Sequence, residues 1–195
     1  MRSLNFVLSL AAAVAVVGCA TDPAMQPVAR PDAKFGKPVS NADLAKWDID
    51  IRTSDGRGLP AGQGSVADGK KIYEAKCIAC HGADAKGGAV YGAMVGGVGS
   101  FKTTTRVLTP GSMYPYAPIL FDYIRRAMPM DKPQSLTPNE VYALSGYILN
   151  LNGLVPADAT MDANSLPKVM MPNRDGFIVD DRPDVNATRC MQNCK

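Results

Sequence analysis

The stretch CIACH, residues 77–81, constrains this chain more than any other feature of its sequence. Two cysteines separated by two residues and followed at once by a histidine form the attachment pattern of c-type haem. On one helical turn, the two thiols can reach both vinyl groups of a single porphyrin, and the adjacent imidazole can lie under the iron. The sequence therefore predicts covalent haem c on Cys77 and Cys80, with His81 as the proximal iron ligand.

Two other interpretations of the Cys-x-x-Cys pair fit less well. A structural zinc site needs further ligands, and the chain contains no second Cys-x-x-Cys pair. A redox dithiol of the thioredoxin type needs a strand–helix context that the flanking sequence lacks. Because there is also no second Cys-x-x-Cys-His motif, we expect a single haem.

The distal ligand must be sought elsewhere, because the chain contains one histidine in all. A lysine would have to lose its proton, whereas a methionine thioether is a common alternative. We expect Met128, because it ends a helical pattern and precedes Pro129, which favours an extended backbone there. Met130 is the alternative two residues on. The other candidates, each of which could instead fill a gap in the core, are Met25, Met94, Met113, Met161, Met170, Met171 and Met191.

The segment 66–77, which leads into the haem motif, is expected to be a helix. Ser65 can cap it, and Asp68 completes a capping-box-like pattern three residues later. Gly69 costs this helix roughly 1 kcal/mol relative to alanine, which is reasonable where another helix crosses closely. The stripe that would face that helix consists of Val66, Gly69 and Tyr73.

Two further helices are expected after the glycine-rich connection 82–101, which would lie against the edge of the haem. The segment 114–128 carries apolar residues at helical spacing. Thr137 starts a second helix, with a proline and a capping-box glutamate behind it, and Gly153 ends it. No segment of this body has the pattern of a strand. The apolar positions are Ile119, Leu120, Tyr123, Ile124 and Ala127 in the first helix and Val141, Leu144, Ile148 and Leu151 in the second.

The N-terminus is typical of an exported lipoprotein. Residues 1–18 combine a positive start with an apolar run too short to span a bilayer comfortably, which predicts a signal peptide. The residues VVGC that end at Cys19 resemble a lipobox, so we expect Cys19 to be acylated and the protein to be held at a membrane surface in the periplasm. Residues 19–64 then form a tether and N-terminal extension, rich at first in proline and alanine.

Residues 154–195 show no sustained period, and we expect an extended, irregular tail. Such a tail can cover an apolar surface of the folded domain, which we favour, or act as a docking arm for a partner. Cys190 and Cys194 remain after the other cysteines are assigned. In an exported protein, this pair is expected to form a disulfide.

The haem motif after a capped helix, the methionine–proline loop and the capped last helix with its aromatic resemble a class I monohaem c-type cytochrome. The resemblance covers residues 65–153. It implies an all-α domain in which the first and last helices cross, with Gly69 and Tyr73 against Tyr147. It also carries the iron ligands over to His81 and Met128.

A narrower resemblance extends from Trp47 to the C-terminus. The stretch YPYAPILFDYIRRAMPMDKPQSLTPNEVYALSGYILNLNG, together with MPNRDGF, is similar to the cytochrome subunit of bacterial sulfite and sulfur dehydrogenases. That resemblance implies an electron donor with a molybdopterin subunit and a downstream cytochrome or oxidase as acceptor. Some members of the group carry a second haem domain, for which this chain has no motif.

Electron transfer is therefore the expected function, with no catalytic activity of the chain alone. Ligation by histidine and methionine raises the haem potential and leaves no open iron position for a substrate. The alternatives are a general membrane-tethered cytochrome c for other dehydrogenases and a ligand-binding haem protein with a labile sixth ligand. The net charge of +3 and the lack of a basic run give no indication of a nucleic-acid partner.

Overall fold

The computed structural model describes residues 36–182. The chain divides into two units, Met1–Asp43 and Leu44–Lys195, and the boundary in the sequence falls within helix α2 (Asn41–Leu44). Cys19, the expected signal peptide and the Cys190–Cys194 pair lie outside the described residues. Along 36–182, no helix has the length and apolar character that a membrane crossing requires.

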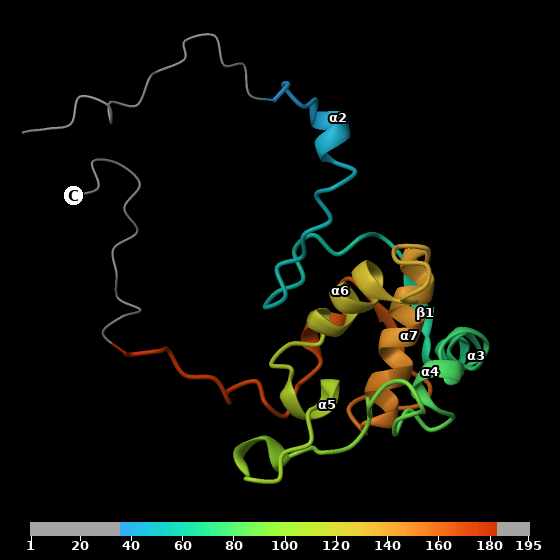
Figure 1. Ribbon diagram of the computed structural model, residues 1–195, viewed down its shortest axis with the longest axis vertical. Helices are drawn as coiled ribbons and strands as arrows, with labels where there is room; N and C mark the ends of the chain where they lie inside the picture. Colours follow the sequence, from blue (N-terminus) through green and yellow to red (C-terminus); the bar gives the residue numbers. More distant parts are fainter. Residues whose placement is uncertain (1–35, 183–195) are drawn as a thin grey trace, which may run out of the picture. The chain divides into compact units, whose positions relative to one another are not determined.

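Two helices of the larger unit, α3 (Val66–Lys76) and α7 (Pro138–Leu151), cross in close contact (Figure 1). A Cβ on Gly69 would overlap the carbonyl oxygen of Ala143, so only glycine allows the backbones to approach this far. The rings of Tyr73 and Tyr147 meet beside this point, with centroids 5.4 Å apart and planes at 54°. The helix crossing expected from the sequence is confirmed.

Both of these helices begin as their sequences predict. The Ser65 hydroxyl accepts a hydrogen bond from the Asp68 N–H at 3.1 Å. At the start of α7, the Thr137 hydroxyl accepts from the Glu140 N–H at 3.3 Å, and the Glu140 carboxylate accepts from the Thr137 N–H at 2.8 Å. These reciprocal bonds satisfy N–H groups that an uncapped helix would leave without partners.

The middle helix is shorter than expected. A single turn, α5 (Pro110–Met113), comes first, and α6 (Pro118–Ala127) follows. Tyr123 was expected on the apolar stripe of this helix, but its side chain is 52 % exposed. Phe121 is buried in its place and packs against Tyr142 with ring centroids 4.5 Å apart. Tyr123 fits the helical period, but α7 contacts the neighbouring face of α6.

A small sheet corrects the expectation that this body contains no strand. The strands β1 (Gln63–Ser65) and β2 (Thr160–Asp162) pair antiparallel, with Gly64 opposite Met161. Three-residue strands are too short to leave an alternating pattern in the sequence. The sheet joins the start of α3 to the chain that follows α7.

The segment after α7 also differs from the expected extended tail. Met161, Leu166, Val169 and Met171 are buried in the core around β2 and the 3-10 turn η4 (Leu166–Lys168). Residues 160–171 cover an apolar surface of the domain, which is the alternative favoured from the sequence, but they do so with two short regular elements instead of a wholly irregular chain. These residues leave no periodic signal because the elements that carry them are only three residues long or irregular. The exposed, irregular character returns at residues 177–182.

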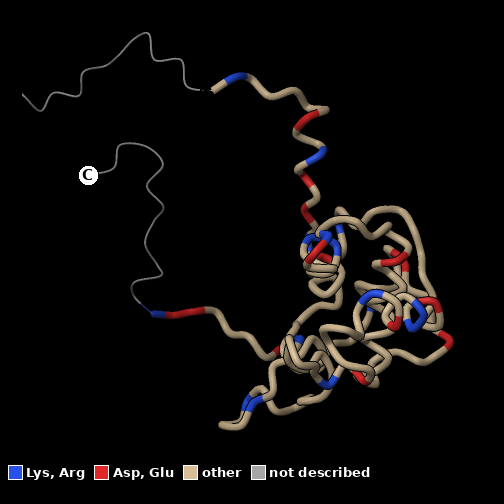
Figure 2. Tube along the Cα trace, turned by 45° about the vertical axis from the view of Figure 1, so that its right-hand side comes forward, with Lys and Arg blue, Asp and Glu red and all other residues tan. Residues whose placement is uncertain are grey.

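Charged groups fasten the chain before β1 to the helices. The Arg126 guanidinium bonds to both carboxylate oxygens of Asp122 at 2.9 Å and to Asp50 at 2.8 Å. It also donates to the carbonyl of Ile49 at 3.2 Å. Elsewhere, lysines and arginines alternate with aspartates and glutamates along the described trace (Figure 2). This mixture agrees with the lack of a basic run in the sequence.

Candidate functional site

The haem motif begins at the residue that caps the C-terminus of α3. Cys77 closes α3 with a bond from its N–H to the Tyr73 carbonyl at 2.8 Å, and the single turn α4 (Ile78–His81) follows. Gly82 ends this turn with φ of 77°, and a Cβ there would overlap the carbonyl oxygen of Gly87. The Tyr73 hydroxyl donates to the Gly82 carbonyl at 2.7 Å, which ties the end of the motif to α3.

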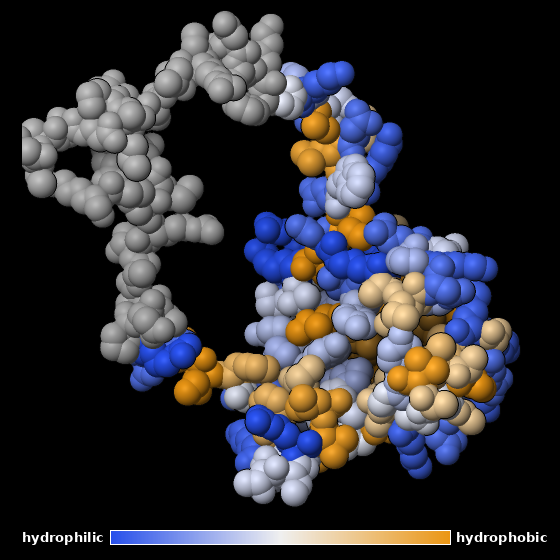
Figure 3. Space-filling model, in the orientation of Figure 1, coloured by the Kyte–Doolittle hydropathy of each residue, from blue (hydrophilic) through white to orange (hydrophobic). Residues whose placement is uncertain are grey.

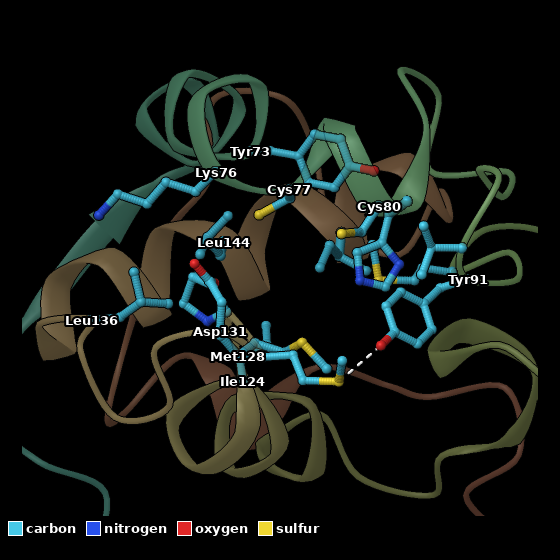
Figure 4. Close-up of a pocket in the computed structure, with 16 residues that line it drawn as sticks. Tyr73, Lys76, Cys77, Cys80, Tyr91, Ile124, Met128, Asp131, Leu136 and Leu144 are labelled. Carbon is cyan, nitrogen blue, oxygen red and sulfur yellow. Dashed lines mark hydrogen bonds between the residues drawn. The ribbon is translucent and has the colours of Figure 1, made fainter.

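A largely apolar cavity opens next to this turn (Figure 4). The sulfur atoms of Cys77 and Cys80 lie on one side of it, and the side chain of Met128 points in from the opposite side. The first helix, the last helix and the loop after α6 therefore supply three of its walls. The lining residues are Tyr73, Lys76, Cys77, Cys80, His81, Val90, Tyr91, Met94, Ile124, Met128, Pro129, Met130, Asp131, Leu136, Leu144 and Ile148.

Both cysteines are half-buried free thiols. Burial is the main cause that raises the pKa of Cys77 to about 11, so this group is a neutral thiol at pH 7. The two thiols line one cavity without being joined to each other, which leaves both available for bonds to a common ligand.

His81 presents a neutral ring to the same cavity. Burial lowers the pKa of this imidazole below its ordinary value of 6.5. Its Nδ1 atom is buried and has no hydrogen-bond partner among the described residues. Burying a polar nitrogen without a hydrogen-bond partner costs free energy. A further group bound to this ring would remove that cost. Neutral imidazole is also the form that binds a metal.

Three of the methionines in the described residues line the cavity: Met94, Met128 and Met130. Met128 caps α6 with φ of −119° and ψ of 144°, which confirms the extended backbone predicted from Pro129. Its side chain is half-buried against the core, whereas Met130 is 62 % exposed. Of the other candidates, Met161 and Met171 are buried in the core as gap-filling residues, and Met170 is 70 % exposed.

The glycine-rich connection forms a further wall, as the sequence predicts in outline. Tyr91 donates its N–H to the Cys80 carbonyl at 3.3 Å. The Asn152 side chain, at the end of α7, donates to the Met94 carbonyl and accepts from the Gly96 N–H, both at 3.1 Å. Val90 is 61 % exposed here. Figure 3 shows that hydrophobic residues reach the surface among hydrophilic ones on the face that it displays. The contacts of Tyr91 and Asn152 leave no signal in the sequence.

The lining fits a haem c group. It combines two free thiols, a neutral imidazole with a buried nitrogen that lacks a partner, and thioether sulfurs, inside walls that are otherwise mostly apolar. A covalently attached haem uses two thiols for its thioether links to the protein. Its iron takes imidazole and methionine sulfur as ligands, and apolar side chains surround the porphyrin.

The helical fold and this cavity define a haem-binding domain of the c type. The family model for cytochrome c matches residues 66–152. A chain in the crystal structure of the sulfane dehydrogenase SoxCD from Paracoccus pantotrophus is 33 % identical, with a TM-score of 0.71, over 84 % of this chain and 82 % of that one. A comparison with curated proteins finds no match. This chain belongs to the cytochrome c family.

Membership of this family implies covalently bound haem c and a role in electron transfer. The similarity to the sulfane dehydrogenase structure links the chain to sulfur dehydrogenases, as the narrower sequence resemblance implies.

Proposed function

We propose that the protein is a periplasmic electron carrier with one haem c. It accepts electrons from a molybdopterin-containing sulfite or sulfur-compound dehydrogenase and passes them to a downstream cytochrome or oxidase. The observation that carries this proposal is the cavity that brings together the thiols of Cys77 and Cys80, the imidazole of His81 and the thioether of Met128. The similarity to a chain of the sulfane dehydrogenase supports the choice of donor.

Each of these side chains has a separate task. Haem c, when bound, supplies an iron that alternates between the ferric and ferrous states. Cys77 and Cys80 would anchor it covalently, and His81 and Met128 would supply ligands to its iron. The soft thioether of Met128 favours the ferrous state, and the apolar walls keep water away; both effects raise the potential. With both residues as ligands, the chain would favour electron transfer over substrate binding at the iron.

The donor is tested by direct reduction. The purified, oxidised protein is mixed with a purified molybdenum sulfur dehydrogenase and either sulfite or a sulfane compound, and haem absorbance is followed. We expect rapid reduction that needs both enzyme and substrate. Reduction by unrelated dehydrogenases at the same rate would favour the general membrane-tethered carrier instead.

The ligand set is tested by spectroscopy. A weak far-red absorbance band in the oxidised protein reports methionine ligation. We expect Met128→Ala to lose this band and to bind carbon monoxide rapidly when reduced, while Met130→Leu, the matched control, keeps the wild-type spectrum. Rapid carbon monoxide binding by the wild-type protein would instead favour a ligand-binding haem protein with a labile sixth ligand.

The termini complete the proposal. Residues 1–18 act as a lipoprotein signal peptide, and acylated Cys19 anchors the protein on a membrane. Cys190 and Cys194 form a disulfide after export. Mass spectrometry of the mature protein measures cleavage, acylation and the disulfide together. Cys19→Ser should move the protein from the membrane fraction to the soluble fraction, whereas an unchanged distribution would contradict the anchor.

A further inference from the structure

Tyr91 lies against the single histidine of the chain, although it belongs to the connection that follows the haem motif. Its ring stacks on the imidazole of His81, with centroids 5.4 Å apart and planes at 28°. This separation is one at which aromatic rings attract each other. Both side chains line the haem cavity, so the stack forms part of its wall.

The His81 ring lacks the contact that usually orients a metal-binding histidine. Such a histidine almost always donates its second ring N–H to a carbonyl, a carboxylate or water, and this bond fixes the orientation of the ring. Within residues 36–182, the ring of His81 makes no hydrogen bond, and its Nδ1 atom is buried without a partner. The stack of Tyr91 is therefore the contact that can restrain rotation of this imidazole.

Tyr91 is itself held at three points. Its N–H donates to the Cys80 carbonyl at 3.3 Å, and its carbonyl accepts from the Gly88 N–H at 2.9 Å. Its hydroxyl donates to the sulfur of Met130 at 2.8 Å, drawn as the dashed line in Figure 4. A Cβ on Gly88 would overlap the Cys80 carbonyl oxygen, so the connection that carries Tyr91 lies directly on the haem motif. The tyrosine ring is thus fixed relative to the residues that present the imidazole.

We propose that Tyr91 is a positioning residue that sets the orientation of the His81 imidazole about its bond to the haem iron. Rotation about that bond would turn the imidazole plane away from the tyrosine ring and lose the stack. The orientation of the imidazole decides which iron d orbitals it overlaps, and it is one of the properties through which surrounding residues tune a metal. This inference rests on the proposed function, because it takes His81 as an iron ligand.

The strength of one ring pair sets the size of the effect. An aromatic pair of this kind corresponds to a preference of about two- to tenfold for the stacked arrangement. Tyr91→Phe keeps the ring and removes the hydroxyl, whereas Tyr91→Leu removes the ring as well. The comparison of the two variants therefore separates the stack on His81 from the hydrogen bond to Met130.

The test is nuclear magnetic resonance of the haem-loaded full chain, isotopically labelled only in histidine. Because the chain has one histidine, every labelled signal reports His81. In the reduced protein, nuclear Overhauser contacts from the imidazole protons to the haem meso protons give the angle of the ring. In the oxidised protein, the spread of the haem methyl resonances responds to the same angle.

Tyr91→Phe should leave the ring angle and the methyl spread as they are in wild type. Tyr91→Leu should raise the share of molecules with a rotated imidazole by about two- to tenfold. This increase appears as contacts to meso protons that wild type lacks and as a smaller methyl spread. Tyr123→Leu, the same change at a tyrosine outside the cavity, is the matched control and should change nothing.

A wild-type ring angle in Tyr91→Leu would overturn the proposal. A change in Tyr91→Phe as large as that in Tyr91→Leu would also overturn it, because the bond to Met130 would then be the cause. Where Tyr91→Leu fails to retain haem, the wild-type protein decides. Its His81 and Tyr91 rings should show mutual nuclear Overhauser contacts, and their absence would overturn the inference. A wild-type protein without the far-red band would instead contradict the ligand set of the proposed function.

Discussion

Gly69 on α3 faces the carbonyl of Ala143 on α7 so closely that any side chain at position 69 would overlap this oxygen. The contact lies beside the Tyr73–Tyr147 ring pair, and Tyr73 in turn bonds to the Gly82 carbonyl at the end of the haem motif. The close approach of α3 to α7 therefore also determines the position of the haem motif, with Cys77, Cys80 and His81, relative to α7.

Gly69→Ala tests this contact. Alanine favours a helix by about 1 kcal/mol, but the clash forces the two helices apart and should destabilise the protein by about 1–3 kcal/mol. The measurement is urea unfolding of the haem-loaded protein. Gly92→Ala is the control, because a Cβ at position 92 has nothing within 4 Å. An unchanged midpoint for Gly69→Ala would contradict the close crossing.

The chain after α7 gives a second prediction. Leu166 is fully buried, although the sequence around it shows no periodic pattern. Leu166→Ala should cost roughly 2–5 kcal/mol, as for a residue in a helical core. Truncation after Val179 should leave the stability of the protein within about 0.5 kcal/mol of the full chain, whereas truncation after Gly153 should prevent stable folding. Equal stability of the two truncated proteins would show that residues 154–179 are dispensable.

Glu140 gives a prediction on pH. Its hydrogen bond from Lys76, followed by that from the Thr137 N–H, lowers the pKa of Glu140 below 4.5. A carboxyl with a lowered pKa in the folded state stabilises the protein above its unfolded-state pKa, and the effect is lost as pH falls through the folded-state value. Glu140→Gln mimics the protonated form. Wild type should therefore be the more stable of the two at pH 7, and the difference should shrink below about pH 4.5.

Thermal unfolding of both proteins between pH 7 and pH 3 measures this difference. Asp131→Asn is a control at a carboxylate outside the capping box. A difference between wild type and Glu140→Gln that stays constant down to pH 3 would contradict the assigned cause.

Asn152 gives a prediction on the glycine-rich wall. Its side chain makes three hydrogen bonds, to the Met94 carbonyl, the Ile148 carbonyl and the Gly96 N–H. Asn152→Ala removes all three and should destabilise the protein by about 2–4 kcal/mol, at roughly 1 kcal/mol or more for each bond. Hydrogen exchange at Gly96 should speed up, because its amide loses its partner. Asn164→Ala, at an exposed position, is the control. Unchanged exchange at Gly96 would show that other contacts hold the loop.

Several features could be predicted because they depend on neighbours in the sequence. The caps of α3 and α7 need only residues three positions apart, and both form as expected. The extended backbone of Met128 follows from the proline after it. Gly69 on an apolar stripe indicated a close helix crossing, because a glycine there is costly without one.

Other features depend on which distant segments meet. The exposure of Tyr123 and the burial of Phe121 follow from the face of α6 that α7 covers, and both residues fit a helical pattern. The pairing of Gly64 with Met161 joins segments almost a hundred residues apart, each too short to show a strand pattern.

The sequence by itself determined the chemistry of the site, because Cys77, Cys80 and His81 are adjacent and the chain has no second histidine. Only the tertiary structure decided which methionines line the cavity and how each is held. In the sequence, Met128 and Met130 follow the same helix, and only Pro129 favours Met128. They differ because Met128 packs against the core, whereas Met130 projects toward the hydroxyl of Tyr91, which a separate segment brings to the cavity.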